Sequence, residues 1–134
     1  MLLPQGTVFA LVDGEQFELY HNVGLEAEPR LAKIRQPVLK ETNKSTGVRR
    51  QSKTRNPGDD QLDENAHAIA VIDWLNAMAI SGSLEKLVIA ADPRSLGEMR
   101  KRYHKKLKEI LIGDLDRTLA GAPVETIVKI FHNA

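Results

Sequence analysis

The chain has 134 residues, of which 42% are hydrophobic and 28% charged, a size and balance typical of one globular domain. It contains no cysteine, which excludes disulfides, thiol chemistry and cysteine-based zinc sites. No apolar run approaches the roughly 20 residues of a membrane span, and residues 1–4 lack the pattern of a secretory signal. We therefore expect a cytoplasmic protein that does not contact a membrane.

The net charge of +1 conceals a segregation of charge along the chain. Residues 40–55 contain six basic residues and one acidic residue, and residues 98–108 again contain six and one, so each segment has a net charge of +5. The rest of the chain holds 7 basic and 16 acidic residues, a balance of −9. The near-neutral total therefore combines two basic segments with an acidic body.

The N-terminal part predicts an antiparallel meander. Residues 7–12 are rich in strand-forming residues and end at Asp13-Gly14, a pair typical of a tight hairpin turn with positive φ angles. Residues 16–20 alternate polar and apolar, as a half-buried strand does, and residues 31–35 offer a weaker third strand.

Residues at about 37–59 predict a long, mobile, basic loop, because they contain few apolar residues. Loops longer than about 12 to 15 residues are uncommon in compact domains and are often functional. After this loop, Asp60 is predicted to cap a helix that begins at Gln61 and runs to about Ile80. Trp74 lies beside the apolar stripe of this helix, and we expect it at the edge of the core rather than stacked on a partner.

Residues 86–91 are apolar without alternation, which predicts a central parallel strand covered on both faces. Ser95 and Glu98 have the spacing of a capping box and predict the start of a second helix with apolar residues on one side. Residues 109–113 then resume a strand pattern, and Pro123 opens a final helix.

This order of elements predicts an α/β fold, with one domain over residues 1–134. We expect a mixed sheet that opens with the antiparallel meander, later strands joined by crossovers, and helices on both faces of the sheet.

The run Leu-Val-Ile-Ala-Ala-Asp-Pro-Arg-Ser-Leu-Gly-Glu-Met-Arg at 87–100 resembles the signature of the bacterial family called protein required for attachment to host cells. Residues 10–14, Leu19-Tyr20 and residues 114–119 follow the order of that family, so the resemblance extends over nearly the whole chain. The family is in turn similar to the middle domain of archaeal and eukaryotic peptide-chain release factors. The resemblance implies an RNase-H-like α/β arrangement.

In the release-factor domain, a loop after the meander carries Gly-Gly-Gln into the ribosomal catalytic centre. The corresponding residues here, 40–60, contain no Gly-Gly-Gln, so we do not expect peptide release by that mechanism. The basic charge of the segment still suits a ribosome or another RNA. The name of the family implies an indirect, intracellular role in attachment to host cells rather than a surface adhesin.

The basic loop supplies the candidate nucleic-acid contacts, because clustered cations attract phosphate backbones. It has no aromatic residue for base stacking, so contacts to phosphates are expected. A solvated loop without a partner is the open alternative. The candidate residues are Lys40, Lys44, Arg49, Arg50, Lys53 and Arg55.

Two further groups of residues suggest sites. Arg94 and Ser95 follow a buried strand and open a helix, a position that can bind anions, although Ser95 and Glu98 satisfying the helix amides is the favoured interpretation. Asp13, Asp92 and Asp114 are candidates for a two-metal nuclease site of the RNase-H type, but Asp13 is already explained by the hairpin.

The sequence therefore predicts a binding or regulatory module rather than an enzyme, without a cofactor and with RNA or the ribosome as partner. Two alternatives stay open: a carboxylate-metal nuclease, and a protein-protein interaction module that does not bind nucleic acid. Nothing in the sequence sets the oligomeric state.

Overall fold

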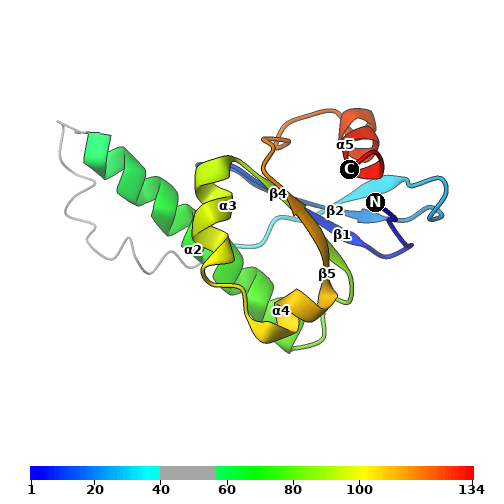
Figure 1. Ribbon diagram of the computed structural model, residues 1–134, viewed down its shortest axis with the longest axis horizontal. Coiled ribbons are helices and arrows are strands. Elements are labelled where there is room, and N and C mark those ends of the chain that lie inside the picture. The colour runs from blue at the N-terminus through cyan, green and yellow to red at the C-terminus, as the bar shows by residue number, and fades with distance from the viewer. Residues whose placement is uncertain (40–56) are drawn as a thin grey trace.

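The computed structural model describes the backbone of residues 1–39 and 57–134 and the side chains of residues 1–39 and 65–134. The described chain forms a single α/β domain with a five-stranded mixed sheet and four helices (Figure 1). The strands are β1 (Val8–Val12), β2 (Phe17–Asn22), β3 (Leu31–Ile34), β4 (Leu87–Ala91) and β5 (Leu111–Leu115). The helices are α2 (Pro57–Ile80), α3 (Pro93–Arg100), α4 (Lys105–Ile110) and α5 (Val124–His132).

The sheet has the strand order β3-β2-β1-β4-β5. The strands β1, β2 and β3 form the predicted antiparallel meander, while β4 pairs in parallel with both β1 and β5. All five residues of β4 are buried, which confirms the prediction of an interior parallel strand drawn from its unbroken apolar run.

The β1–β2 turn differs from the predicted tight turn with positive φ angles. Neither Asp13 nor Gly14 has a positive φ, and the backbone N–H of Asp13 donates to the carbonyl of Gln16 at 3.0 Å. The Asp13 carboxylate accepts from the backbone N–H of Glu15 at 2.7 Å and from that of Gln16. The turn is therefore built by an aspartate side chain that replaces backbone partners, which requires no left-handed residue.

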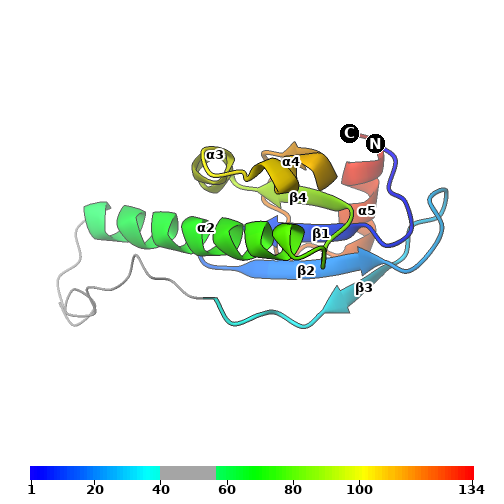
Figure 2. The same ribbon diagram turned by 90° about the horizontal axis from the view of Figure 1, so that it is seen from below.

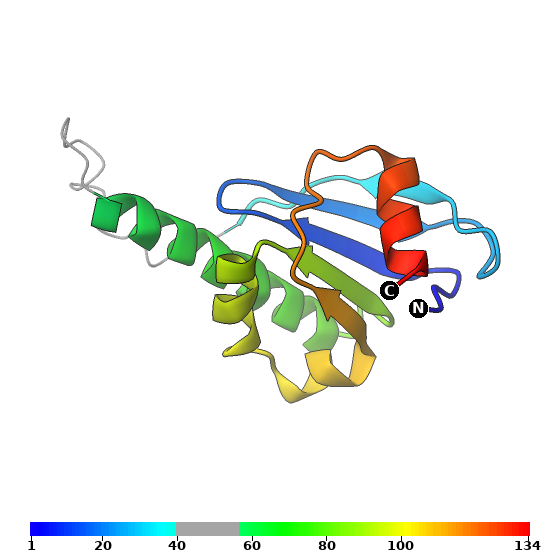
Figure 3. The ribbon, with the colours of Figure 1, turned by 45° about the horizontal axis from the view of Figure 1, so that its top comes forward.

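Helices lie on both faces of the sheet, as predicted. Figures 2 and 3 show α2, α3 and α4 on one face and α5 across the other. The larger core lies under the three helices and includes Phe17, Ile72, Leu75, Ile89 and Met99. The smaller core lies under α5, where the rings of Phe9 and Phe131 meet edge to face with centroids 5.2 Å apart.

Helix α2 begins at Pro57, so the predicted cap at Asp60 is wrong and residues 57–59 of the predicted loop are helical. Proline fits the first turn of a helix because its missing N–H would have no helical partner there. The predicted mobility of residues 40–56 lies outside the described residues. The helix ends at Ile80 as predicted, with Gly82 at φ +81° and a hydrogen bond from Ser83 N to the Met78 carbonyl at 2.9 Å.

Two residues of α2 fasten it to the hairpin. Trp74 is half-buried and meets Phe17 edge to face, with ring centroids 5.9 Å apart, which confirms its predicted place at the edge of the core. The Nε2 of the buried His67 donates to the Gln16 carbonyl at 3.1 Å. The long helix therefore contacts the start of β2 and the turn before it through one apolar and one polar contact.

The predicted second helix is divided into α3 and α4 by residues 101–104. The next strand begins at Leu111, because Glu109 and Ile110 belong to α4. Pro123 occupies the N-cap position of α5, as its place in the sequence predicts. Among residues 1–39 and 57–134, no helix combines the length and the apolar character needed to cross a membrane.

Candidate nucleic-acid interface

Helix α3 starts at the end of the buried strand β4 and is capped by Asp92. The Oδ2 atom of Asp92 accepts a hydrogen bond from the backbone N–H of Ser95 at 3.1 Å, and Pro93 occupies the first helical position. Glu98 forms an ion pair with Lys101 at 3.3 Å instead of returning to Ser95. The predicted Ser95–Glu98 capping box is therefore wrong, because the aspartate before the proline already holds the helix N-terminus.

The junction between α3 and α4 is held by one side chain of α2. The Nδ2 of Asn76 donates to the Arg102 carbonyl at 2.9 Å, and the backbone N–H of His104 donates to Asn76 Oδ1 at 3.0 Å. The Nδ1 of His104 then caps α4 by accepting from the backbone N–H of Lys106 at 3.0 Å. Because Asn76 satisfies a donor and an acceptor that a continuous helix would pair internally, the chain turns here and α4 takes a new direction.

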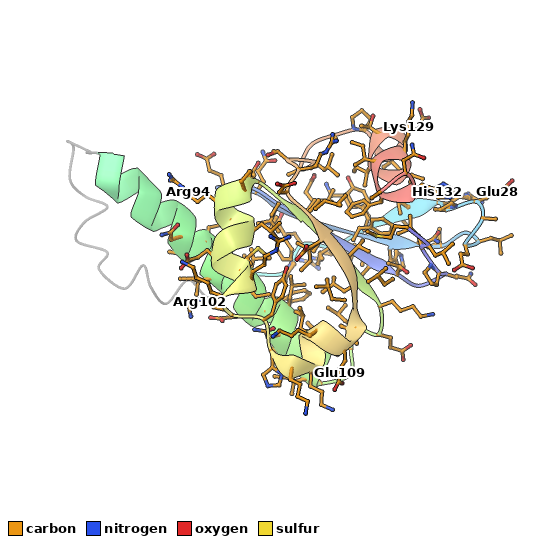
Figure 4. All side chains as sticks on the ribbon, viewed as in Figure 1. Glu28, Arg94, Arg102, Glu109, Lys129 and His132 are labelled. Atoms are coloured by element: carbon orange, nitrogen blue, oxygen red, sulfur yellow. The ribbon has the colours of Figure 1, made fainter. Side chains whose placement is uncertain are left out.

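We define the α3–α4 basic surface as the six exposed cations of the segment 98–108. All six are exposed on α3, on α4 or on the residues between them, Arg100 reaches Asp114 of the edge strand β5, and Figure 4 labels Arg102. The six residues are Arg100, Lys101, Arg102, Lys105, Lys106 and Lys108.

Among the described side chains, three of these six cations form ion pairs and three do not. Besides the Lys101–Glu98 pair, Arg100 binds Asp114 and Lys106 lies 4.0 Å from Glu109. Within residues 1–39 and 65–134, no ion pair involves Arg102, Lys105 or Lys108. Lys105 and Lys108 are three residues apart on α4 and therefore lie on one side of the helix. The surface thus offers an uncompensated positive charge to an anionic partner.

Asp114 of β5 anchors this surface to the sheet. Arg100 donates to it through two nitrogens, Nη2 to Oδ1 at 2.6 Å and Nε to Oδ2 at 3.1 Å, and the Tyr103 hydroxyl donates to Oδ2 at 2.8 Å. A bidentate guanidinium–carboxylate pair fixes orientation as well as distance. The network ties the last turn of α3 and the junction that follows it to the edge strand β5.

The charges within this network shift the titration of its members. The hydrogen bonds from Arg100 are the main reason why the pKa of the Asp114 carboxyl lies below its usual value. Burial, followed by its hydrogen bond to Asp114, raises the pKa of Tyr103 well above the ordinary phenol value. The same hydrogen bond and charge from Asp114 raise the pKa of Arg100. Asp114 is therefore ionised and Tyr103 neutral at physiological pH.

Comparison with protein families gives a match to the bacterial archaeo-eukaryotic release factor family 12 over residues 6–131. The chain belongs to this family. The match includes every strand and every helix except the last residue of α5. It supports the relationship to release factors, whereas the resemblance to the host-attachment family stays a prediction. No curated protein matches the chain.

The six cations that the sequence proposed as nucleic-acid contacts of this family 12 protein all lie outside the described residues. They belong to the segment 40–56, which precedes α2 in the chain. The α3–α4 basic surface is therefore the basic segment whose geometry can be described. The six predicted residues are Lys40, Lys44, Arg49, Arg50, Lys53 and Arg55.

The structure separates the two residues of the proposed anion site. Arg94 is exposed on the first turn of α3, whereas Ser95 is only 2% exposed and its backbone N–H already donates to Asp92. Within the part of the chain whose side chains are described, the buried Ser95 Oγ and Asp92 Oδ1 have no hydrogen-bond partner. The helix start thus presents an aspartate, rather than a free amide, to an incoming anion.

The three aspartates proposed as metal ligands are each engaged separately. Asp13 builds the β1–β2 turn, Asp92 caps α3, and Asp114 binds Arg100 and Tyr103. Among the described side chains, no group of three or more His, Cys, Asp or Glu residues is placed to hold a metal ion. In this chain these carboxylates therefore shape a turn, a helix start and a junction.

The charge of the segment 98–108 is visible in the sequence. Asn76 and Asp114, the residues that shape its surface, were not predicted in that role. The polar Asn76 within a largely apolar helix was the available signal, since a buried or half-buried amide needs partners. The partners of Asp114 gave no signal, because they depend on how β5 packs beside α3.

Proposed function

We propose that this protein is a non-enzymatic RNA-binding module that associates with ribosomal or other structured RNA. The observation that carries the proposal is the α3–α4 basic surface, where six exposed cations face solvent and three of them have no acidic partner in the described chain. Such a surface gains free energy by neutralising phosphates and releasing their counterions. Membership of a release-factor family supports RNA as the polyanion.

The surface is suited to phosphates rather than to bases. Its one aromatic residue, Tyr103, is half-buried and donates its hydroxyl to Asp114, so it is not available for stacking. Lysine and arginine side chains on a helix reach backbone phosphates without reading sequence. We therefore expect weak sequence preference and strong dependence on salt.

The basic segment 40–55 is the second part of the proposal. It precedes α2, the helix against which α3 and α4 pack, and it has the same net charge of +5 as the segment 98–108. We propose that its cations, including Arg49, Arg50 and Arg55, contribute further phosphate contacts. In this proposal the protein acts in the cytoplasm, and any effect on attachment to host cells is indirect.

The decisive measurement is the salt dependence of binding to a fluorescently labelled fragment of ribosomal RNA. The wild type is compared with two triple variants, Arg102→Ala/Lys105→Ala/Lys108→Ala and Arg49→Ala/Arg50→Ala/Arg55→Ala. If each lost cation contacts one duplex phosphate, each triple variant flattens the log-log salt slope by up to about 3 units. Binding to whole ribosomes is scored by co-sedimentation at low and high salt.

A matched control removes the same charge elsewhere. Lys86, Arg117 and Lys129 are exposed and lie outside both basic segments, so replacing all three by Ala changes the net charge equally. The control is expected to keep the wild-type slope. If the control flattens the slope as much as the surface variant does, general charge explains the binding. An absence of binding at low salt rejects the RNA proposal.

A further inference from the structure

Among residues 1–39 and 57–134, the edge of the sheet at β3 has no neighbouring strand. In the described chain β3 pairs with β2 alone, and Figure 2 shows it as the outermost strand of the sheet. An edge strand carries a row of backbone N–H and C=O groups that can pair with another strand. A strand added here would become the sixth of the sheet.

The register identifies the backbone groups that face outward. The N–H of Val23 donates to the Arg30 carbonyl at 2.8 Å, so this pair is hydrogen-bonded across the β2–β3 ladder. In an antiparallel ladder, hydrogen-bonded and non-hydrogen-bonded pairs alternate. Leu31 and Lys33 therefore direct their backbone N–H and C=O groups away from β2, towards the open edge.

Two hollows lie beside these residues, on the face of the sheet that carries α5. Leu31 lines a hollow of about 450 Å³ together with Val124 and Val128 of α5. Lys33 lines another of about 370 Å³ together with Glu15, Glu18 and Gln36. Because Leu31 and Lys33 are two residues apart on one strand, alternate side chains of an added strand would enter the two hollows.

The charge of the edge selects the kind of strand. Arg30, Lys33 and Arg35 are all exposed, which places three cations within six residues. Glu18 is already engaged, since its carboxylate accepts from the Gly121 N–H at 2.6 Å and lies 3.5 Å from Lys33 Nζ. A second copy of β3 would bring like charges together, whereas an acidic strand would be attracted.

We propose that the β3 edge binds an extended acidic segment of a partner protein by strand addition. The preferred segment has an apolar side chain for the hollow beside Leu31 and an acidic side chain two residues away for Lys33. The backbone of the edge supplies general affinity, and the two hollows supply selectivity. This proposal rests on different residues from the RNA-binding proposal and does not depend on it.

Selection from a phage-displayed library of random twelve-residue peptides on the full chain tests the proposal. We expect enriched peptides in which apolar and acidic residues lie two positions apart. A labelled enriched peptide is then titrated against the wild type by fluorescence anisotropy. On binding, amide exchange should slow at Leu31 and Lys33, because their N–H groups donate to the added strand.

Two substitutions at one position test the backbone and the charge of the edge. Lys33→Pro removes the charge together with an outward N–H that β2 does not use, whereas Lys33→Glu reverses the charge while keeping the backbone intact. Each is expected to weaken peptide binding about tenfold or more. Lys129→Glu, an exposed charge reversal on α5, is the matched control and should leave binding unchanged. Circular dichroism and the melting temperature check that the variants are folded.

Four results would overturn the proposal. These are a library that yields no enriched peptide, enriched peptides without the alternating pattern, enriched peptides whose affinity survives Lys33→Glu, and a wild type that sediments as a dimer dissociated by Lys33→Pro. The last result would make a second copy of the chain the occupant of the edge. The first would mean that Lys33 protects the edge from pairing, as edge lysines do in many sheets.

Discussion

The two faces of the sheet are covered very differently. On one face, α2, α3 and α4 enclose a core that includes Ile72, Leu75 and Ile89. On the other face a nine-residue helix, α5, buries Ile127 and Phe131 against Phe9 and leaves hollows on its flanks. One of these, of about 430 Å³, lies between Lys129 of α5 and Leu115 of β5, and another lies beside β3.

The two faces of the sheet therefore differ in what they contribute to the protein. The face with three helices provides most of the buried apolar surface, and the outer side of its helices carries the basic charge. The face with α5 is too thinly covered to enclose five strands, because one short helix shields only part of a sheet. The first face therefore accounts for most of the stability. We propose phosphate binding on the outer side of its helices and peptide recognition beside the β3 edge on the second face.

The largest expected effect tests the core under the three helices. Leu75→Ala should lower the free energy of unfolding by about 2 to 5 kcal/mol, because Leu75 is fully buried and its loss leaves a cavity. Urea denaturation measures the change. Ile80→Ala, at a half-exposed position on the same helix, should stay within about 0.5 kcal/mol. Equal effects of the two substitutions would contradict the packing of α2 described here.

The next effect concerns the junction that directs the basic surface. Asn76→Ala should cost about 1 to 2 kcal/mol, since the Arg102 carbonyl and the His104 N–H both lose their partner. Amide exchange at residues 102–106 should accelerate. Asn76→Asp keeps an acceptor for His104 and should lose less. An unchanged exchange rate in Asn76→Ala would mean that the break between α3 and α4 is held by other contacts.

The pH dependence of stability tests the anchor at β5. The pKa of Asp114 is lower in the folded protein than in the unfolded chain. The ionised carboxylate therefore contributes to the free energy of unfolding above the ordinary carboxyl pKa of about 3.9, and this contribution is lost as the pH falls through the pKa of the folded protein. Asp114→Asn should therefore destabilise the protein by about 1 kcal/mol at pH 7, a modest effect because solvent screens the half-exposed Arg100.

This difference between Asp114→Asn and the wild type should shrink below pH 4. Thermal unfolding followed between pH 2 and pH 7 measures it. Glu85→Gln, which changes an exposed carboxylate, should parallel the wild type throughout. A constant gap between Asp114→Asn and the wild type at all pH values would show that lost packing, rather than the ion pair, causes the destabilisation.

The smallest effect concerns the face with α5. Val128 is half-exposed on the wall of the hollow beside Leu31, so Val128→Ala should cost less than about 1 kcal/mol in urea denaturation. The same substitution should weaken binding of a selected peptide, because the peptide side chain would lose apolar contact. A loss of stability comparable to that of Leu75→Ala would mean that the hollow is closed in solution.

Patterns within one element predicted most of the fold. The unbroken apolar run of β4 predicted an interior strand, and the end of α2 was predicted at about Ile80, where Gly82 follows closely, because both signals depend on local chemistry. The start of α3 was predicted wrongly because Asp92 and Ser95 both have side chains that cap helices. Pro93 distinguishes them, since proline favours the position directly after the cap.

Features that depend on distant residues were not predictable from local patterns. Leu96, Met99, Tyr103 and Leu107 keep helical spacing across the break between α3 and α4, so the apolar pattern gives no sign of it. The break depends on Asn76, which lies on another helix. The charge of the candidate site was visible in the sequence. Which of its cations form ion pairs depends on where the fold places the carboxylates of Glu98, Glu109 and Asp114.

The parallel pairing of β1 with β4 has a consequence for how the chain folds. Val8 lies opposite Leu87, so this ladder closes a loop of about 80 residues, while the meander forms from neighbouring residues. Closing a long loop costs entropy before its contacts form, which slows folding. We expect the hairpin to form early and the β1–β4 register to limit the folding rate. Because this entropy grows only logarithmically, changes of a few residues between β3 and α2 should alter that rate little.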